Sequence, residues 1–390
     1  MSLKFSKENL ILLSGFIWGL SGFTVEIIAE SSFKALALRF LFILIPFIII
    51  YSNLVFKINK NYLVSFILFS FYILVVLLNS VVFGFEKTYL LREVILFFSF
   101  ITILILLNKN VFIKQFIDGV YYSLILLVFF YFTQLDFTKI FSPIYRFETN
   151  LNPNGVGIIT VMLFMISLYK IHLTTKKSHK LFLILINLMS FLVIFAAKSR
   201  TVLIIMTLGF IFLNIYFKNK KILLFTTLVL VLVVSLNYNK FSTLIRLKTY
   251  ETEVKGQKIT KLTGRTELWK KGIKIIYEHP ILGVGPIKSK VKVDTHIGTY
   301  HNAYIQLLVT VGFLGFFPIL IMLMVAFKRL IFDKENFLIK VIFITGILSS
   351  IVETRLLNYG SPPNLLFFVS FIYLSRIKLS SDFEENKLEI

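Results

Sequence analysis

Residues 62–84 read YLVSFILFSFYILVVLLNSVVFG, an apolar run of 23 residues without one charged side chain. A helix needs about 20 residues to cross the hydrocarbon core of a bilayer. Similar runs recur along the 390-residue chain, which is 57% hydrophobic and only 16% charged. A soluble domain is nearer about 25% charged. The composition therefore excludes a soluble enzyme, a disordered chain and a coiled coil, and the unbroken runs exclude an outer-membrane β-barrel.

The sequence predicts an all-α polytopic membrane protein with about 12 transmembrane helices. A single helix over 181–217 would be longer than a bilayer requires, so we divide it at the polar sequence Lys198-Ser199-Arg200-Thr201. The expected spans are 9–29, 35–56, 62–84, 88–107, 113–133, 154–171, 181–197, 201–217, 222–238, 302–327, 337–353 and 362–377.

Basic residues predict the orientation of these spans. The formal net charge is +22, and the lysines lie in short clusters between apolar runs. The positive-inside rule produces this pattern, so no nucleic-acid partner is expected. Nineteen Lys and Arg residues flank one set of span ends, and nine flank the other. We expect the richer side to be cytoplasmic, which places both termini inside.

This orientation divides the chain into three parts. Residues 1–238 contain the first nine spans, 239–301 form one long extracytoplasmic loop, and 302–390 contain the last three spans and a cytoplasmic tail. The long loop contains a helical pattern, so we interpret it as functional rather than disordered.

The sequence gives no indication of a metal or a cofactor. It contains no cysteine, and its five histidines show neither HxxxH nor HExxH spacing. Thiolate catalysis and cysteine-ligated zinc are therefore excluded, and a structural metal site is not expected.

Charged residues near the spans collect at the predicted outer ends. Each one alone is compatible with an interface anchor whose charge reaches water. Together they favour a polar vestibule that opens outward, because charge within a span is costly and usually functional. The residues are Glu26, Glu30, Arg39, Arg92, Glu93, Lys198, Arg200, Glu353 and Arg355.

Two arginines are candidate phosphate ligands. Arg200 lies in a tight turn between two apolar helices and is either a phosphate ligand or an interface anchor. Arg265 begins a predicted helix over 265–279, where a guanidinium beside free N–H groups suits phosphate. The same helix carries one apolar stripe and one lysine stripe, which is typical of a helix in the membrane interface. An incidental arginine on that helix is the alternative.

Two short polar segments precede predicted spans on the outer side. His301-Asn302 precedes the tenth span, where a histidine can serve as a base, a phosphate ligand or a structural residue. Asn152-Pro153-Asn154-Gly155 precedes the sixth span and is typical of a turn into a helix; contact with sugar or phosphate is the alternative.

These residues together resemble the superfamily of O-antigen ligases and Wzy-type O-antigen polymerases, which build bacterial surface glycans. The match consists of His301-Asn302, nine residues, and then Gly312-x-x-Gly315. Gly264-Arg265-Thr266-Glu267-Leu268-Trp269, the Pro280 to Gly285 turn and the Ser199-Arg200-Thr201 turn also resemble the family. The resemblance is strong over about 198–320 and elsewhere extends to topology and the Asn-Pro-Asn segment.

The resemblance implies a GT-C-like transferase of the bacterial inner membrane that requires no metal. Its donor would be a glycan on undecaprenyl pyrophosphate, and its site would face the periplasm or the cell exterior. Arg200 and Arg265 would hold the pyrophosphate, and His301 would act near the acceptor hydroxyl or the reacting phosphate. Additional implied partners are membrane lipids, a chain-length regulator and a flippase. We expect further substrate contacts from Asn302, Asn152, Asn154, Arg92, Glu353, Arg355 and Lys198.

The chemistry of the residues agrees with an inverting transfer. Lipid pyrophosphate leaves without a protein acid, and fixed guanidinium groups stabilise its charge. A polymerase would extend a lipid-linked chain, whereas a ligase would move the finished chain onto lipid A-core. A Phe-, Ile- and Lys-rich composition is typical of AT-rich genes and favours the polymerase. A secondary transporter and an assembly scaffold are the alternatives outside the enzyme class; no internal repeat supports the transporter.

Overall fold

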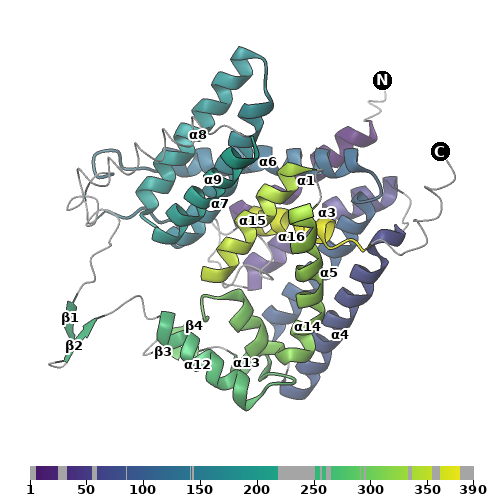
Figure 1. Cartoon of the computed structure of the whole chain (residues 1–390), viewed down its shortest axis with the longest axis vertical. Helices are drawn as coiled ribbons and strands as arrows, with labels where there is room; N and C mark the ends of the chain where they lie inside the picture. The colour runs from purple at the N-terminus through teal and green to yellow at the C-terminus, as the bar shows by residue number, and fades with distance from the viewer. Residues whose placement is uncertain are drawn as a thin grey trace.

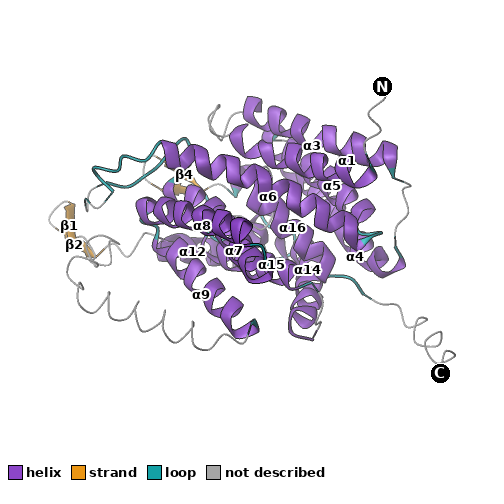
Figure 2. Ribbon diagram, turned by 90° about the horizontal axis from the view of Figure 1, so that it is seen from above, coloured by secondary structure: helices purple, strands orange, loops and turns teal. Residues whose placement is uncertain are grey.

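The computed structural model describes residues 6–24, 33–54, 59–84, 86–140, 142, 145–217, 251–254, 257–260, 265–289, 291–293, 296–332, 336–353 and 361–377. In this part of the chain, helices form the body of the protein (Figures 1 and 2). Glu26, Glu30 and Arg355 lie outside it.

Seven helices among the described residues are long and apolar enough to cross a membrane. They are α3 (Phe33–Asn53), α4 (Leu63–Phe83, preceded by the turn η2, Lys60–Tyr62), α5 (Lys87–Leu106), α6 (Asn110–Thr133), α7 (Pro153–Leu173), α8 (Lys177–Ala197) and α14 (Ala303–Phe332). The chain is thus a polytopic helical membrane protein, as predicted from its composition.

The other predicted spans fall on shorter helices. These are α1 (Lys7–Gly19, continued by the turn η1, Leu20–Gly22), α9 (Arg200–Tyr216), α15 (Phe337–Val352) and α16 (Pro362–Leu374). The predicted span at 222–238 lies outside the described residues, so the total of twelve stays a prediction. The predicted break between α8 and α9 is confirmed: Lys198 takes a left-handed φ of 46°, and the Ser199 hydroxyl caps α9.

The described residues between α9 and α14 form two helices and two hairpins. The helices are α12 (Arg265–Glu278) and α13 (Gly285–Lys288). β1 (Glu251–Val254) pairs antiparallel with β2 (Gln257–Thr260), and β3 (Val291–Val293) pairs with β4 (His296–Gly298). The prediction did not include these hairpins, because strands of three or four residues are too short to give a clear periodicity.

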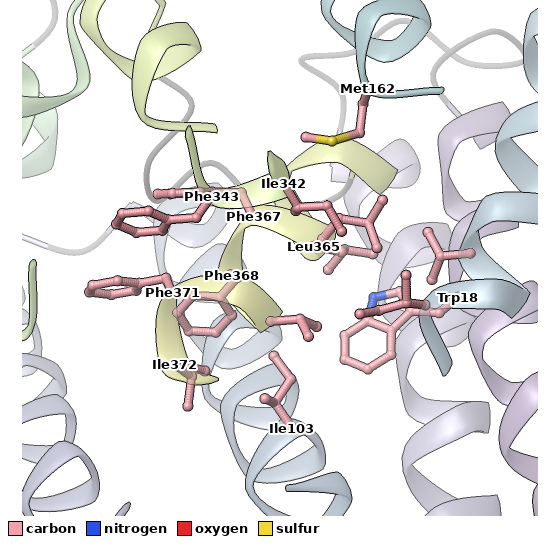
Figure 3. Packing of buried hydrophobic residues seen from close by; sticks show 14 of the residues in the cluster. Trp18, Ile103, Met162, Ile342, Phe343, Leu365, Phe367, Phe368, Phe371 and Ile372 are labelled. Atoms are coloured by element: carbon pink, nitrogen blue, oxygen red, sulfur yellow. The ribbon is translucent and has the colours of Figure 1, made fainter. Parts of the chain in front are cut away.

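Helix α16 lies at the centre of the helical body. All of its residues are buried, which explains why it is apolar on every side. Figure 3 shows Phe367, Phe368 and Phe371 of this helix among side chains that include Trp18 and Phe343. The Phe343 and Phe367 rings are stacked with their centroids 5.8 Å apart.

Glycines allow α1 and α6 to approach closely. A Cβ atom at Gly15 would lie 2.2 Å from the carbonyl oxygen of Phe116, and one at Gly119 would lie 2.1 Å from that of Leu12. Small residues at such crossings let two backbones touch, which maximises van der Waals contact. This pair of helices therefore depends on the absence of side chains at Gly15 and Gly119.

Helix α14 contains a kink at Gly312, where φ is 63° and ψ is −168°. The kink frees backbone N–H groups, and the turn that follows α12 accepts two of them. Phe313 N donates to Pro280 O at 2.8 Å, and Leu314 N donates to Ile281 O at 3.1 Å. The kink separates residues 303–311 from 313–332. The second part alone has about the 20 residues that a span requires.

We expect Gly119→Val to destabilise the protein by about 1–3 kcal/mol, because its side chain must displace the Leu12 backbone. Thermal unfolding in detergent measures the effect. Leu126→Val on the same helix is the control, because Leu126 is exposed on the surface of α6. Equal unfolding midpoints for the two variants would contradict this account of the α1–α6 contact.

Candidate active site

The carboxylate of Glu353 is the centre of a polar cluster at the end of α15. Glu353 directly follows the helix, and its backbone N–H donates to Ser349 O at 2.9 Å. Its side chain is only 6% exposed. A carboxylate this deeply buried is costly unless cations and hydrogen bonds compensate its charge.

Three side chains from distant parts of the sequence contact this carboxylate. Asn154 Nδ2 donates to Glu353 Oε1 at 2.7 Å, and Arg265 Nη2 donates to the same oxygen at 3.1 Å. His301 Nδ1 lies 3.1 Å from Oε2. Both oxygens therefore have partners, and Arg265 provides a full opposite charge.

His301 lies at the junction between the outer segment and α14. Its φ of 48° places it in the left-handed region, which is uncommon for a residue with a side chain. Trp269 Nε1 donates to the carbonyl oxygen of the preceding residue, Tyr300, at 2.9 Å. Helix α12 thus begins at Arg265 and, one turn later, fixes the backbone that leads to His301.

Packing supports the same connection between α12 and His301. The Tyr300 side chain is fully buried, and burial raises the pKa of its phenol. A Cβ atom at Gly272 would lie 2.5 Å from Ile305 and 2.9 Å from the Tyr300 ring. Gly272 therefore lets α12 lie directly against Tyr300 and the first turn of α14.

Asn302 caps α14 and joins it to α15. Its Oδ1 accepts from the backbone N–H groups of Tyr304 and Ile305, both at 3.0 Å. Its Nδ2 donates to Ile351 O at 3.0 Å. These contacts hold the residue before α14 next to the residue after α15, so Asn302 positions His301 beside Glu353.

The Asn-Pro-Asn segment contributes one cap and one site residue. Asn152 Oδ1 accepts from Gly155 N at 2.8 Å and caps α7, as the turn interpretation predicts. Asn154 lies in the first turn of α7 and connects Glu353 to Ser199. Ser199 Oγ donates to Asn154 Oδ1 at 2.7 Å. The beginnings of α7 and α9 thus meet beside Glu353.

The predicted basic residues occupy different positions. Arg200 is the first residue of α9, directly after Ser199; its side chain is outside the described part of the structure. Lys198 is buried, its Nζ donates to Ser142 O, and it lies over the Tyr145 ring. Burial lowers the pKa of this ammonium group. These contacts anchor the loop before α7 to the end of α8.

Arg92 lies on α5 and takes no part in the Glu353 contacts described above. Its Nε atom is buried without a hydrogen-bond partner among the described residues. The structure therefore joins His301, Arg265, Glu353 and Asn154 directly, and Arg200 through the backbone position of Ser199.

Sequence reasoning missed the roles of Ser199 and Trp269. Ser199 carried a signal, because a serine directly before an apolar helix is a typical N-cap. No sequence signal predicts the contact of Trp269 with Tyr300, because this contact depends on how α12 packs against α14.

Comparison with protein-family models matches residues 184–320 to a family described as O-antigen ligase. The matched part includes Ser199, Arg200, Arg265 and His301, whereas Asn154 and Glu353 lie outside it. Neither the curated proteins nor the solved structures contain a match to the chain.

Arg265→Met is expected to destabilise the protein by about 3 kcal/mol, because it leaves the buried Glu353 charge with weaker compensation. Arg265→Met/Glu353→Gln should recover much of this loss, because the charge that needed compensation is gone. Unfolding midpoints in detergent measure both effects.

The exposed pair of Lys274 and Glu278 on the same helix offers a matched control. These groups lie 3.8 Å apart and are 77% and 52% exposed. Exposed pairs contribute little, so Lys274→Met should change the midpoint only slightly. An additive loss in the double variant would show that Arg265 does not compensate the Glu353 charge.

Proposed function

We propose that the chain polymerises lipid-linked glycan repeat units, and the match of residues 184–320 to a family described as O-antigen ligase supports a glycan-transferring enzyme of this kind. The donor is an oligosaccharide on undecaprenyl pyrophosphate, and the acceptor is a hydroxyl of another lipid-linked unit. The reaction takes place at the outer leaflet of the cytoplasmic membrane and inverts the configuration of the donor sugar.

The observation that carries this proposal is the joint contact of Arg265 and His301 with Glu353. Arg265, a cation that can bind pyrophosphate, and His301, an imidazole that can accept a proton from a hydroxyl, both contact the buried carboxylate of Glu353. Arg265 and His301 are 20% and 37% exposed, so both can be reached by a ligand. Glycosyl transfer from a lipid pyrophosphate needs these two functions side by side.

The contact with Glu353 defines the chemistry of His301. An ionised carboxylate only accepts hydrogen bonds, so Nδ1 of His301 carries the proton. Nε2 is then the basic nitrogen and is suited to accept a proton from the acceptor hydroxyl. As His301 becomes positively charged, the Glu353 carboxylate stabilises it, which is the function of the acid in a catalytic triad.

The proposed transfer forms one bond at C1 of the donor sugar and breaks another. The acceptor oxygen forms a bond to C1 of the donor sugar and gives its proton to His301 Nε2. The bond between C1 and the pyrophosphate oxygen breaks, and its electron pair remains on the pyrophosphate. Arg265 and Arg200 stabilise this charge, and guanidinium groups suit the task because they stay protonated. Asn154 positions Glu353.

A ligase is the second candidate, and the description of the matched family favours it. The same cluster serves both reactions, because donor, leaving group and bond change are identical. Only the acceptor differs: a lipid-linked repeat unit for the polymerase, lipid A-core for the ligase.

Purified protein in proteoliposomes, given a lipid-linked repeat unit alone, should produce a ladder of longer lipid-linked glycans. Gel electrophoresis of the products measures this. Transfer that requires added lipid A-core, with no ladder in its absence, would identify the ligase instead. If neither acceptor is glycosylated, the proposal of glycosyl transfer fails, and the transporter and scaffold interpretations return.

Variants in the same assay test the assigned residues. We expect His301→Ala and Glu353→Gln to lower kcat by about 10²–10⁴-fold, because both impair proton transfer. Arg265→Ala and Arg200→Ala should lower it by about 10²-fold or more through loss of charge stabilisation.

Lys176→Ala, an exposed residue before α8, is the control and should retain wild-type activity. Membrane expression is compared for all variants. Wild-type activity of His301→Ala or Arg265→Ala would contradict the site assignment while leaving the reaction class open.

A further inference from the structure

The segment α12–α13 has an exposed apolar surface that its packing on the protein does not use. Leu268, Ile275 and Ile276 pack with Tyr300 and Val309, so this side of α12 faces the protein. Ile273 and Tyr277 lie one helical turn apart on α12 and remain exposed, Tyr277 to 82%. Ile281 and Ile287 follow in the chain and are also exposed, Ile281 to 67%.

Ile281 and Ile287 lie beside the exposed apolar surfaces of two long helices. Ile281 O accepts from Leu314 N at the kink of α14, where Phe313 and Phe317 are exposed. Ile287 lies against Gly84, directly after α4, whose last turn exposes Val81 and Val82. In a spanning helix such exposed apolar residues face lipid.

A hydrogen bond from the Asn79 side chain holds this segment at the end of α4. Asn79 Nδ2 donates to Leu282 O at 2.5 Å, and a Cβ atom at Gly285 would lie 2.5 Å from Phe83. Leu282 and Gly285 therefore lie where the lipid-facing surface of α4 ends, and the end of a spanning helix corresponds to the membrane interface.

The charges next to this apolar surface are mainly basic. Lys270 and Lys274 lie next to Ile273 and Tyr277 on the exposed face of α12, and Lys288 is exposed beside Ile287. Glu267 and Glu278 lie farther around α12 from Ile273 than Lys270 does, given 100° per residue. Lysines beside an apolar strip attract anionic lipid headgroups.

We propose that Ile273, Tyr277, Ile281 and Ile287 insert into the membrane interface and that Lys270, Lys274 and Lys288 bind anionic phospholipid headgroups. The segment thereby fixes α12, and with it Arg265, at the level of the headgroups. This inference requires the chain to span a membrane but not to transfer glycans, so the two proposals fail separately.

The absence of cysteine makes a direct test possible, because each introduced cysteine is the only one. A nitroxide label is attached to each of three full-length variants, Ile281→Cys, Ile287→Cys and Glu267→Cys. The labelled proteins are reconstituted in vesicles that contain phosphatidylglycerol and phosphatidylcholine. Power saturation compares collisions with oxygen, which concentrates in lipid, and with a water-soluble nickel complex. We expect a several-fold higher ratio of oxygen to nickel collisions at 281 and 287 than at 267. Equal ratios at the three sites would overturn the insertion.

A second comparison tests the lysines. With the label at Tyr277→Cys, a rising fraction of phosphatidylglycerol should shift the label toward lipid. The shift should be lost in Lys270→Gln/Lys274→Gln and retained in the control Lys176→Gln/Lys177→Gln, whose residues are exposed at the beginning of α8. A shift that persists in the Lys270/Lys274 variant would overturn the headgroup contact. All substituted positions are exposed, and unfolding midpoints verify that the variants fold.

Discussion

The buried charge of Glu353 determines the arrangement around it. A carboxylate with 6% exposure requires compensation, and the structure provides it from Arg265, Asn154 and His301. These residues begin or precede three different helices, α12, α7 and α14. The beginnings of the three helices must therefore lie next to Glu353. One electrostatic requirement thus brings together segments that are up to 199 residues apart in the sequence. The cost of the buried charge is what makes this alignment specific.

Helix α12 connects the cluster around Glu353 to the membrane helix α14. Its first residue contacts Glu353, and Trp269 holds the Tyr300 backbone beside His301. The turn after α12 then supplies carbonyl groups to the kink at Gly312. A side chain at Gly312 would lie 2.2 Å from Ile281 O, so only glycine fits. The number of residues between His301 and Gly312 therefore has a structural reason. It sets the distance along α14 between His301 and the kink, where the turn after α12 hydrogen-bonds to the helix.

The elements of the fold were largely predictable, whereas the contacts between them were not. Long apolar runs identify spans because a bilayer selects for them, and Lys198-Ser199 marks the break between α8 and α9 by its polarity. Hydropathy gives no indication that α16 is the buried centre, because lipid-facing and protein-facing surfaces are equally apolar. The sequence identified Glu353, Arg265 and His301 as separate candidates. Their common contact is a tertiary property, and so is the packing of Leu268, Ile275 and Ile276 against Tyr300.

The charges of the cluster explain why it suits a reaction in which negative charge develops. The charges of Arg265 and Glu353 cancel, which makes the carboxylate compatible with its buried position. In the proposed reaction, a pyrophosphate brings more negative charge than Arg265 alone balances, so a second cation is needed. Arg200 is the candidate that we propose, because it begins α9 directly after Ser199. In the transfer proposed above, His301 gains a proton while the pyrophosphate gains an electron pair. In that proposal the two new charges have opposite signs and form beside the same carboxylate, so each stabilises the other.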